Sequence, residues 1–446
     1  MPDLAPQLES LLRGGVASRA ELQSRLSVSQ PTLSRTIARM GERVVRVGDG
    51  RSARYGLRRE LPHIGSSWPV FQISERGEPE RRGSLIALAR DQYCLAPASD
   101  RGGELSDGLP FFLQDLWPQG FIGRTVPKRF PELALPARIA DWNDTHALAY
   151  LSLRGEDCVG NVLLGEESLQ RFLRRLQLPQ AHVAQNARQE SYPSLADSAI
   201  AGTPAGSSAG GEHPKFTAAV RVGSAVRNVL VKFSPAGTDR VSRRWSDLLV
   251  AEHLAGKALH EFGVITCVSE PIPAGNRMFL ESERFDRVGE RGRIGIVSLA
   301  AVADHYIGRR DNWTAAMNSL RAAGHVSAAD CETVRRAATF GQLIGNSDMH
   351  FGNLSFYFSF GQPLSLAPIY DMLPMTYAPV AADELPDRPF EPPLPNAGNL
   401  DIWKSVAECA EAYWRDVAAH RLVSREFAAQ ASGNAASIAQ ARKLVP

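Results

Sequence analysis

Two aspartates and an asparagine in the second half of the chain have a spacing suited to phosphoryl transfer. Asp348 and Asn353 enclose four residues in the run NSDMHFGN, and Asp371 ends the apolar run LAPIYD. In an Asp-x4-Asn arrangement the aspartate can accept the proton of a substrate hydroxyl while the asparagine holds a magnesium ion. A second carboxylate can join that metal to phosphate oxygens, because Mg²⁺ prefers hard oxygen ligands and keeps several waters. We therefore predict Asp348 as the catalytic base and Asn353 and Asp371 as metal ligands.

A hydrolytic metal site is the alternative that His350 would form with the two aspartates. One histidine and two acids 23 positions apart are weak support for such a ligand cluster. A purely structural role for these residues is the other alternative.

Further upstream, a lysine and a glutamate could bind nucleotide phosphates. Lys232 lies in the strand-like run VLVKF, and Glu252 lies in the helical run LLVAEHLAGKAL. In protein kinases a strand lysine that contacts the phosphates is held by a helix glutamate. Taken one at a time, the two residues could equally be an exposed strand lysine and a solvated helix glutamate.

A glycine-rich run, GSSAGGEHPK at 206–215, leads into the strand-like runs 216–222 and 228–233. Glycines let backbone amides approach phosphate oxygens, so the run is a candidate phosphate loop. It lacks the GxxxxGK[ST] order of a Walker loop, which makes the signal weak when taken alone.

The first 60 residues have the charge of a nucleic-acid-binding module. They contain eleven arginines against six acidic residues, a local charge of +5, whereas the other 386 residues sum to −3. Leucines at 8, 11 and 12, a capping box from Ser18 to Glu21, and an apolar face at 33, 37 and 40 predict three helices. Two strands joined at 48–50 follow.

This order of elements predicts a winged helix-turn-helix, with its third helix in the DNA major groove. Arginines would contact phosphates, and residues on the outer face of the third helix would contact base edges. The alternative is a module that docks proteins. The predicted DNA contacts are Gln30, Thr32, Ser34, Arg35, Arg39, Arg51 and Arg54.

The region between this module and the glycine-rich run shows little chemistry. Strand-like runs at 70–73, 84–88 and 147–153 mix with a helical run at 167–176. From 185 to 214 the chain is rich in Ala, Gly and Ser, which predicts a linker. Six prolines between 379 and 395 predict a surface loop.

Composition excludes several classes of protein. A chain of 446 residues that is 44% hydrophobic and 22% charged can form two to four domains with cores, which excludes a wholly disordered protein. Five widely spaced cysteines without a CxxC pair indicate neither a disulfide framework nor a cysteine zinc site. Without a signal peptide or an apolar run of about 18 residues, we expect a cytoplasmic protein with no membrane partner.

Together these segments resemble the HipA family of bacterial serine/threonine kinases, the toxins of HipA-type toxin–antitoxin systems. The similarity spans most of residues 105–420. The runs that carry it, in the order of the family, are SAGGEHPK, VLVKF, ESERFDR, NSDMHFGN and LAPIYD. A winged helix ahead of such a kinase resembles the YjjJ-type subgroup.

The resemblance implies roles for individual residues. Asp348 would be the catalytic base, Asn353 and Asp371 would hold Mg²⁺, and Lys232 would contact phosphate. Ser208, with Ser207 as its neighbour, would be a regulatory phosphorylation site. The other residues expected to contact ATP lie in three segments: Ala209, Gly210, Gly211, Glu212, His213 and Lys215 in the phosphate loop, Glu283 and Phe285 in the hinge, and His350 in the catalytic loop.

The expected fold class is α+β, with a winged helix-turn-helix ahead of a two-lobed kinase-like part whose C-terminal lobe is mainly helical. The expected domains are a DNA-binding domain at 1–60, a small α/β region at 61–200, an N-lobe at 201–287 and a C-lobe at 288–446. The expected function is transfer of the ATP γ-phosphate, with Mg²⁺, to a serine or threonine of a protein. The resemblance implies an aminoacyl-tRNA synthetase as the substrate class and an antitoxin as a partner. The alternative is a transcriptional regulator whose kinase-like part senses nucleotide or is inactive.

Overall fold

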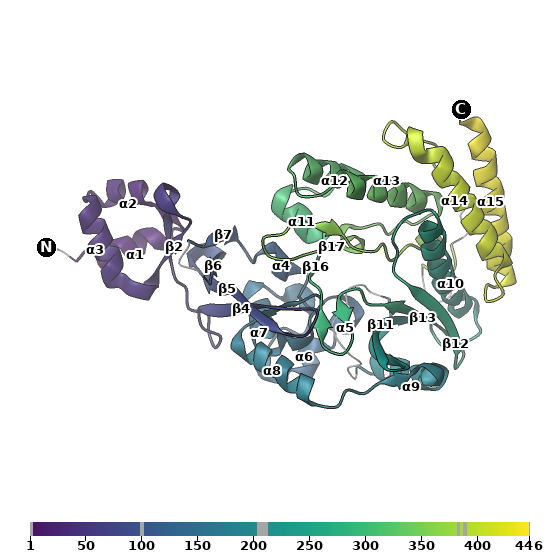
Figure 1. Ribbon diagram of the computed structural model, residues 1–446, viewed down its shortest axis with the longest axis horizontal. Coiled ribbons are helices and arrows are strands. Elements are labelled where there is room, and N and C mark those ends of the chain that lie inside the picture. The colour runs from purple at the N-terminus through teal and green to yellow at the C-terminus, as the bar shows by residue number, and fades with distance from the viewer. Residues whose placement is uncertain (1–2, 99–101, 203–212, 381–383, 387–389, 446) are drawn as a thin grey trace. The chain divides into compact units, whose positions relative to one another are not determined.

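A computed structural model describes residues 3–98, 102–202, 213–380, 384–386 and 390–445. The chain divides into two compact units, and each is described by itself. The first contains Met1–Trp117 and Pro127–Pro179, and the second contains Pro118–Val126 and Gln180–Pro446. Helices and strands are mixed throughout, so the fold class is α+β (Figure 1).

The first unit begins with three helices and a small antiparallel sheet whose strand order is β1-β3-β2. Buried leucines from all three helices form their core, among them Leu8, Leu22 and Leu33. The expected capping box is present, since the Ser18 side chain accepts from the Glu21 amide. The elements are α1 Ala5–Arg13, β1 Ala17–Ser18, α2 Arg19–Leu26, α3 Gln30–Met40, β2 Val44–Val47 and β3 Arg54–Leu57.

A five-stranded antiparallel sheet, ordered β7-β6-β5-β4-β8, forms the rest of the first unit. Its strands are β4 Ser67–Ile73, β5 Pro79–Ala87, β6 Gln92–Pro97, β7 Glu104–Asp107 and β8 Val162–Leu164, and its helices include α4 Phe111–Gln114, α7 Asp144–Arg154 and α8 Glu166–Gln177. The short helix α6 Val126–Arg129 spans the division between the units. α8 agrees with the helix predicted at 167–176.

The strand predicted at 147–153 was wrong, because these residues lie in α7. Asn143 caps this helix by accepting from the amide of His146. Ala147, Leu148 and Leu151 are buried on one helical face. A short apolar run without clear alternation fits a buried strand and a buried helix equally well, so periodicity alone could not separate them.

The two sheets of the first unit are joined at the β2–β3 connection. Gly48 donates a hydrogen bond from its amide to the Gly103 carbonyl at 2.8 Å, and Gly102 donates to Asp49 Oδ1 at 2.7 Å. Below this connection, apolar side chains of both sheets form one cluster: Val45, Val47, Ile86, Leu88 and Cys94. The small N-terminal sheet, through β2, therefore shares a core with the middle region.

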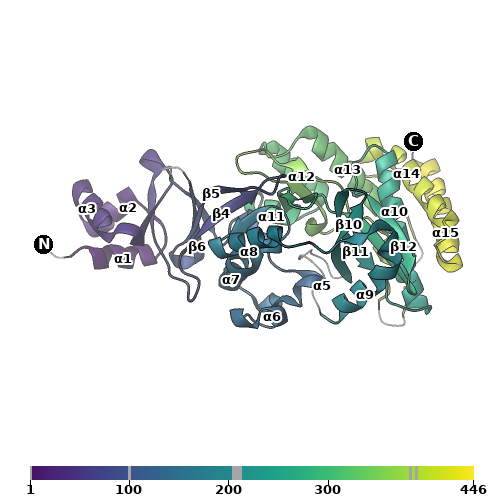
Figure 2. The same cartoon turned by 60° about the horizontal axis from the view of Figure 1, so that its bottom comes forward.

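The second unit begins with a sheet ordered β12-β13-β11-β10-β9, with α9 and α10 packed against it (Figure 2). Its elements are α5 Gly120–Gly123, β9 Val183–Ala184, α9 Arg188–Ile200, β10 Lys215–Val222, β11 Ala225–Phe233, α10 Arg240–Glu261, β12 Ser269–Ala274 and β13 Arg277–Glu283. β10 and β11 agree with the two strands expected after the glycine-rich run.

The linker predicted at 185–214 was wrong over its first part, where α9 forms. Tyr192, Ala196 and Ala199 of α9 are buried against Phe216 and Phe279 of the sheet. Small residues here allow close packing of a helix on a sheet, and this tertiary contact overrides the loop-like composition. The division between the compact units, after Pro179, lies ahead of α9 rather than after residue 200.

The remainder of the second unit is mainly helical. Its elements are β14 Arg287–Val288, β15 Gly292–Arg293, β16 Ile296–Ser298, α11 Leu299–Tyr306, α12 Trp313–Ala322, α13 Ala328–Leu343, β17 Ser355–Tyr357, β18 Ser365–Leu366, α14 Leu400–Ala419 and α15 Arg425–Leu444. The long helices α14 and α15 pack side by side (Figure 1). Within the described parts of the chain, no helix is long and apolar enough to cross a bilayer.

Candidate active site

Lys232 of β11 lies at the centre of an ionic network in the second unit. Its ammonium donates to both carboxylate oxygens of Glu252 in α10, at 2.7 and 2.9 Å, and it also contacts Asp371. The side chain of Lys232 is 9% exposed and that of Glu252 is 10% exposed. The predicted phosphate contact Lys232 and the predicted metal ligand Asp371 are thus in direct contact, and Lys232 is also held by Glu252, as expected.

Burial and charge act in opposite directions on this network. Burial alone would lower the pKa of the Lys232 ammonium, but the charges of Asp371 and Glu252 outweigh burial and raise it. Burial would raise the pKa of the Asp371 carboxyl, whereas Lys232 and Lys215 lower it below its usual value. Burial raises the pKa of Glu252 despite its contact with Lys232. The lysine is therefore held in its charged form inside the protein.

A second lysine lies beside the first because of strand register. Lys215 of β10 is directly opposite Lys232 of β11 in the antiparallel ladder, so both side chains leave the same face of the sheet. Lys215 is 2% exposed, and burial lowers the pKa of its ammonium to about 8. Two cations on one face of a sheet are suited to an anionic ligand.

The run NSDMHFGN at 346–353, the predicted catalytic loop, follows the C-terminus of α13. Asn346 connects Asp348 of this loop with Asp371, since its Nδ2 donates to the Asp371 carbonyl at 3.2 Å and its Oδ1 accepts from the Asp348 amide at 3.0 Å. Asn353 donates from Nδ2 to the Asp348 carbonyl at 2.9 Å, which leaves its Oδ1 for a cation. The Asp348 side chain is exposed, as a group that receives a substrate hydroxyl must be.

Packing against α12 and α13 fixes this loop from behind. The indole of Trp313 donates to the His350 carbonyl at 3.1 Å. A Cβ on Gly341 would overlap the sulfur of Met349, so alanine at this position would require the Met349 side chain to move. The residues on either side of Met349 are Asp348 and His350, and the helical scaffold therefore positions both.

Asp371 has an uncommon backbone conformation. Its φ of +56° lies in the left-handed region, which residues other than glycine rarely adopt. The conformation brings its carboxylate to Lys232 while its carbonyl accepts from Asn346. Strain of this kind persists where surrounding contacts determine it, and it concentrates at functional sites.

A cavity of about 510 Å³ joins these residues. Its polar lining consists of His213, Lys215, Lys232, Glu252, Asp348, His350, Asn353 and Asp371. Trp245, Leu249, Leu373 and Met375 form much of its apolar wall. The predicted catalytic and metal-binding residues therefore line the same cavity.

The predicted hinge residues lie outside the lining of this cavity. Glu283 ends β13, and its carbonyl accepts from the Cys267 thiol at 3.0 Å. Phe285 packs with its ring centroid 5.8 Å from that of Tyr370, the residue before Asp371. The hinge thus contacts the segment that carries Asp371.

Most of the predicted phosphate loop lies outside the described residues, namely Ala209, Gly210, Gly211 and Glu212, together with the two predicted phosphorylation sites Ser207 and Ser208. His213 is described, and its ring centroid lies 4.9 Å from that of Trp245. Burial lowers the pKa of His213 to about 3. This histidine therefore adds no positive charge to the cavity near neutral pH.

The donor set fits a magnesium ion that arrives with a nucleotide. The described residues contain no cluster of three or more His, Cys, Asp or Glu side chains suited to a metal. Mg²⁺ is usually held by one or two protein oxygens together with substrate phosphates. The Asp371 carboxylate and Asn353 Oδ1 meet that need.

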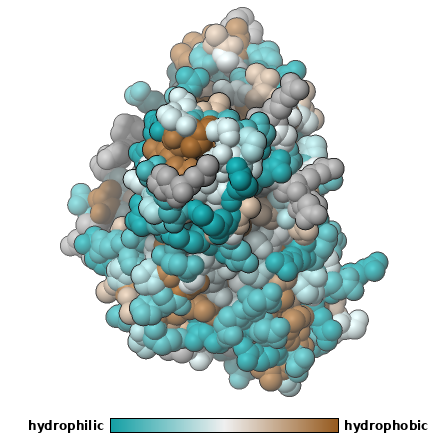
Figure 3. All heavy atoms as spheres, turned by 90° about the vertical axis from the view of Figure 1, so that its left-hand side faces the viewer, coloured by the Kyte–Doolittle hydropathy of each residue, from teal (hydrophilic) through white to brown (hydrophobic). Residues whose placement is uncertain are grey.

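The residues predicted to bind DNA lie in the first unit. Gln30, Ser34, Arg35, Arg39 and Arg54 are exposed, Thr32 is half-buried, and Arg51 lies in the turn Gly50–Ser52. Arg39 forms an ion pair with Asp3. The face seen in Figure 3 is largely hydrophilic, with small hydrophobic patches. Arg35 is the exposed arginine of α3 without an ion pair among the described residues.

Sequence reasoning missed four residues of this site. Asn346 stands in the quoted motif, and its amide could have been recognised as a possible connector. Nothing in the sequence indicated a role in the site for Trp245, Trp313 or Gly341, because an aromatic residue or a glycine in a helical run is normally interpreted as part of helix packing. Their roles follow from tertiary contacts.

Comparison with known proteins identifies the family to which the chain belongs. The family model described as "YjjJ-like toxin, middle domain" matches residues 64–173, and the model described as "HipA-like C-terminal domain" matches residues 207–433. Toxin YjjJ of Escherichia coli (strain K12) is 38% identical over 426 residues, which cover 94% of each chain.

Among solved structures, HipA of Shewanella oneidensis MR-1, in its complex with HipB and operator DNA, matches with a TM-score of 0.52 at 15% identity. The match covers 84% of this chain and 97% of that one, and it shows a shared fold. The sequence resemblance is thus confirmed: the chain belongs to the HipA-like family and, within it, to the YjjJ-like toxins.

Proposed function

We propose that the chain is a toxin kinase that transfers the γ-phosphate of ATP to a serine or threonine of a protein substrate. The observation that carries the proposal is the contact of Lys232 with both Glu252 and Asp371, in the same cavity as Asp348 and Asn353. An inactive remnant has no physical need to keep a buried lysine between two carboxylates, because burying charges is costly.

Each residue has a distinct part in the proposed transfer. Bound Mg-ATP would supply the phosphoryl group and neutralise charge on its oxygens. Asp348 would orient the substrate hydroxyl and accept its proton as the bond from the hydroxyl oxygen to the γ-phosphorus forms and the bond from that phosphorus to the bridging oxygen breaks, so that ADP leaves. Lys232 and Lys215 offset negative charge on the phosphates, and Asn353 and Asp371 provide the oxygen ligands for the metal.

The remaining predicted contacts belong to the same proposal. Ala209, Gly210, Gly211, Glu212 and His213 would cover the phosphates. Glu283 and Phe285 would meet the adenine at the hinge, and His350 would face the transferred group from the cavity wall. Autophosphorylation at Ser208 or Ser207 would remove the loop from the site and silence the kinase.

We further propose that the N-terminal module is a winged helix-turn-helix that binds DNA. The order helix, strand, helix, helix, hairpin and the exposed arginines of α3 and β3 support this proposal. The solved HipA relative is described in a complex with HipB and operator DNA. By analogy, operator DNA and a protein antitoxin are the proposed partners of this chain.

Radiolabelled ATP tests the kinase proposal. Purified protein with Mg-ATP should label itself and proteins of a bacterial lysate, and Asp348→Asn should reduce labelling about 10²- to 10⁴-fold. Asp416→Asn, an exposed position of α14, is the matched control and should label as wild type does. Undiminished labelling by Asp348→Asn would refute the assignment. Nucleotide binding without any transfer would favour the nucleotide-sensing regulator instead.

A further inference from the structure

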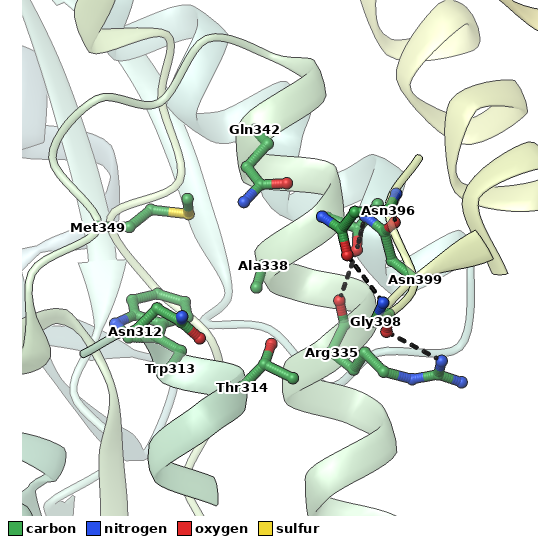
Figure 4. A pocket seen from close by; sticks show the side chains of 11 residues that line it. Asn312, Trp313, Thr314, Arg335, Ala338, Gln342, Met349, Asn396, Gly398 and Asn399 are labelled. Carbon is green, nitrogen blue, oxygen red and sulfur yellow. Dashed lines mark hydrogen bonds between the residues drawn. The ribbon is translucent and has the colours of Figure 1, made fainter. Parts of the chain in front are cut away.

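A second, smaller pocket lies behind the catalytic loop, between α12, α13 and the segment before α14 (Figure 4). Its volume is about 270 Å³. Figure 4 shows Gln342 of α13 with Met349 on one side and Asn396 on the other. Thr314 and Asn312 line it from the start of α12.

This pocket is coupled to the catalytic loop by covalent and hydrogen-bonded connections. Met349, which lines it, directly follows Asp348 in the chain. Trp313, also in the lining, donates to the carbonyl of His350. An extended chain advances about 3.3–3.6 Å per residue, so a peptide whose hydroxyl lies at Asp348 reaches this side of the loop within a few residues.

The pocket offers no uncompensated charge to a ligand. Its cation, Arg335, donates to both carboxylate oxygens of Asp401, at 2.6 and 2.8 Å, and pairs with Glu332 at 2.8 Å. The other polar lining groups are carboxamides and hydroxyls. A phosphate or a carboxylate would therefore gain little here, because its desolvation would not be offset by a free counter-charge.

The lining retains hydrogen-bonding capacity for an uncharged partner. Asn399 is committed to its neighbours, as its Nδ2 donates to Thr339 at 3.4 Å and its Oδ1 accepts from the Asn396 amide at 2.8 Å. Gln342 is exposed at the pocket, and its carboxamide has no hydrogen-bond partner among the described residues. A carboxamide offers two donors and an acceptor, which can pair with the N–H and C=O of a peptide group.

We propose that this pocket binds an uncharged, extended segment of the protein substrate next to the phosphorylated residue, and that Gln342 selects against charge there. The inference rests on the proposed kinase function and names the substrate chemistry of the same site. The pocket volume of about 270 Å³ lies just below the roughly 300–1,000 Å³ of typical small-molecule pockets, so the pocket can hold only a short part of an extended chain.

A degenerate peptide library with one fixed serine or threonine tests the proposal. Each flanking position is varied in turn, and phosphate incorporation from Mg-ATP is measured for every residue type. Wild-type protein should disfavour acidic and basic residues alike at one flanking position. Gln342→Glu should raise labelling of peptides with Lys or Arg at that position at least tenfold, and Gln342→Lys should do the same for Asp or Glu.

Asn318 provides the matched control, because it is exposed on α12 and does not line the pocket. Asn318→Asp and Asn318→Lys should keep the wild-type peptide preference. Unchanged preference in both Gln342 variants would overturn the proposal. It would also be overturned if wild-type protein hydrolysed ATP and labelled no peptide, whereas absence of both ATP hydrolysis and labelling would refute the kinase function itself.

Discussion

Lys232 and Asp371 are 139 residues apart in the chain, and their side chains are in direct contact in a buried ion pair. The contact joins β11 of the sheet to the segment that follows β18. Because Glu252 of α10 holds the same ammonium, three separate elements converge on one cation. The geometry of the proposed active site therefore requires β11, α10 and the segment that carries Asp371 to pack together.

Replacement of this lysine should destabilise the protein. Lys232→Met leaves the carboxylates of Glu252 and Asp371 buried without their cation, and loss of one partner of a buried ion pair costs about 3–5 kcal/mol. We expect the second unit to unfold at a lower urea concentration, with the unfolding transition monitored by far-UV circular dichroism. Lys232→Arg keeps the charge and should lose less. Equal midpoints for wild type and Lys232→Met would contradict the buried network.

A methyl group on α13 should impair catalysis from behind the loop. Gly341→Ala would ordinarily favour a helix by about 1 kcal/mol, but its Cβ would overlap the sulfur of Met349 and force that side chain, next to Asp348 in the chain, to move. We expect a lower kcat with little change in affinity for ATP, measured by labelling kinetics and nucleotide titration. Gly433→Ala in α15 meets open space and is the control. A normal kcat for Gly341→Ala would show that the loop tolerates the shift.

The stability of the protein should rise with pH above about 8 through Lys215. Burial lowers the folded-state pKa of this lysine to about 8, whereas the unfolded chain keeps the ordinary value of 10.5. Between these values the unfolded state binds more protons, so the free energy of unfolding increases with pH. Lys215→Met removes the titrating group and should flatten the difference between pH 7.5 and 10 in urea unfolding. Identical pH profiles would contradict the burial of this ammonium.

DNA binding should depend on Arg35 more than on Arg39. Arg35 is exposed on α3, whereas Arg39 is paired with Asp3 and must first give up that contact. Arg35→Ala should weaken binding to the promoter of its own gene and reduce the slope of log affinity against log salt by about one. Fluorescence anisotropy across a salt series measures both. Arg13→Ala on α1, paired with Glu9, is the control. Unchanged binding by Arg35→Ala would remove α3 as the contact surface.

Much of the site could be predicted because its residues lie in short runs with fixed spacing. Asp348 and Asn353 share one loop, and Lys232 lies in a strand whose alternation is visible in the sequence. The complete ionic network does not follow from any single run, because its residues come from three separate segments of the sequence. The contacts among Lys232, Glu252 and Asp371 require three elements to fold together.

The fold was less predictable where local composition and tertiary packing disagree. The small residues of α9 read as a linker, and only their burial against Phe216 and Phe279 explains a helix there. The sequence of α7 was interpreted as a strand because its apolar residues show no clear helical or strand periodicity. In both cases the deciding interactions come from residues distant in sequence.

The connection between the two sheets of the first unit limits how the N-terminal module can be separated. Val45 and Val47 are covered by Ile86, Leu88 and Cys94, and the Gly48 amide is satisfied by Gly103. A fragment that stops at residue 60 would leave this apolar surface and this donor open to water. Separation of the module as a free domain, by evolution or by engineering, would therefore first require polar side chains on that face.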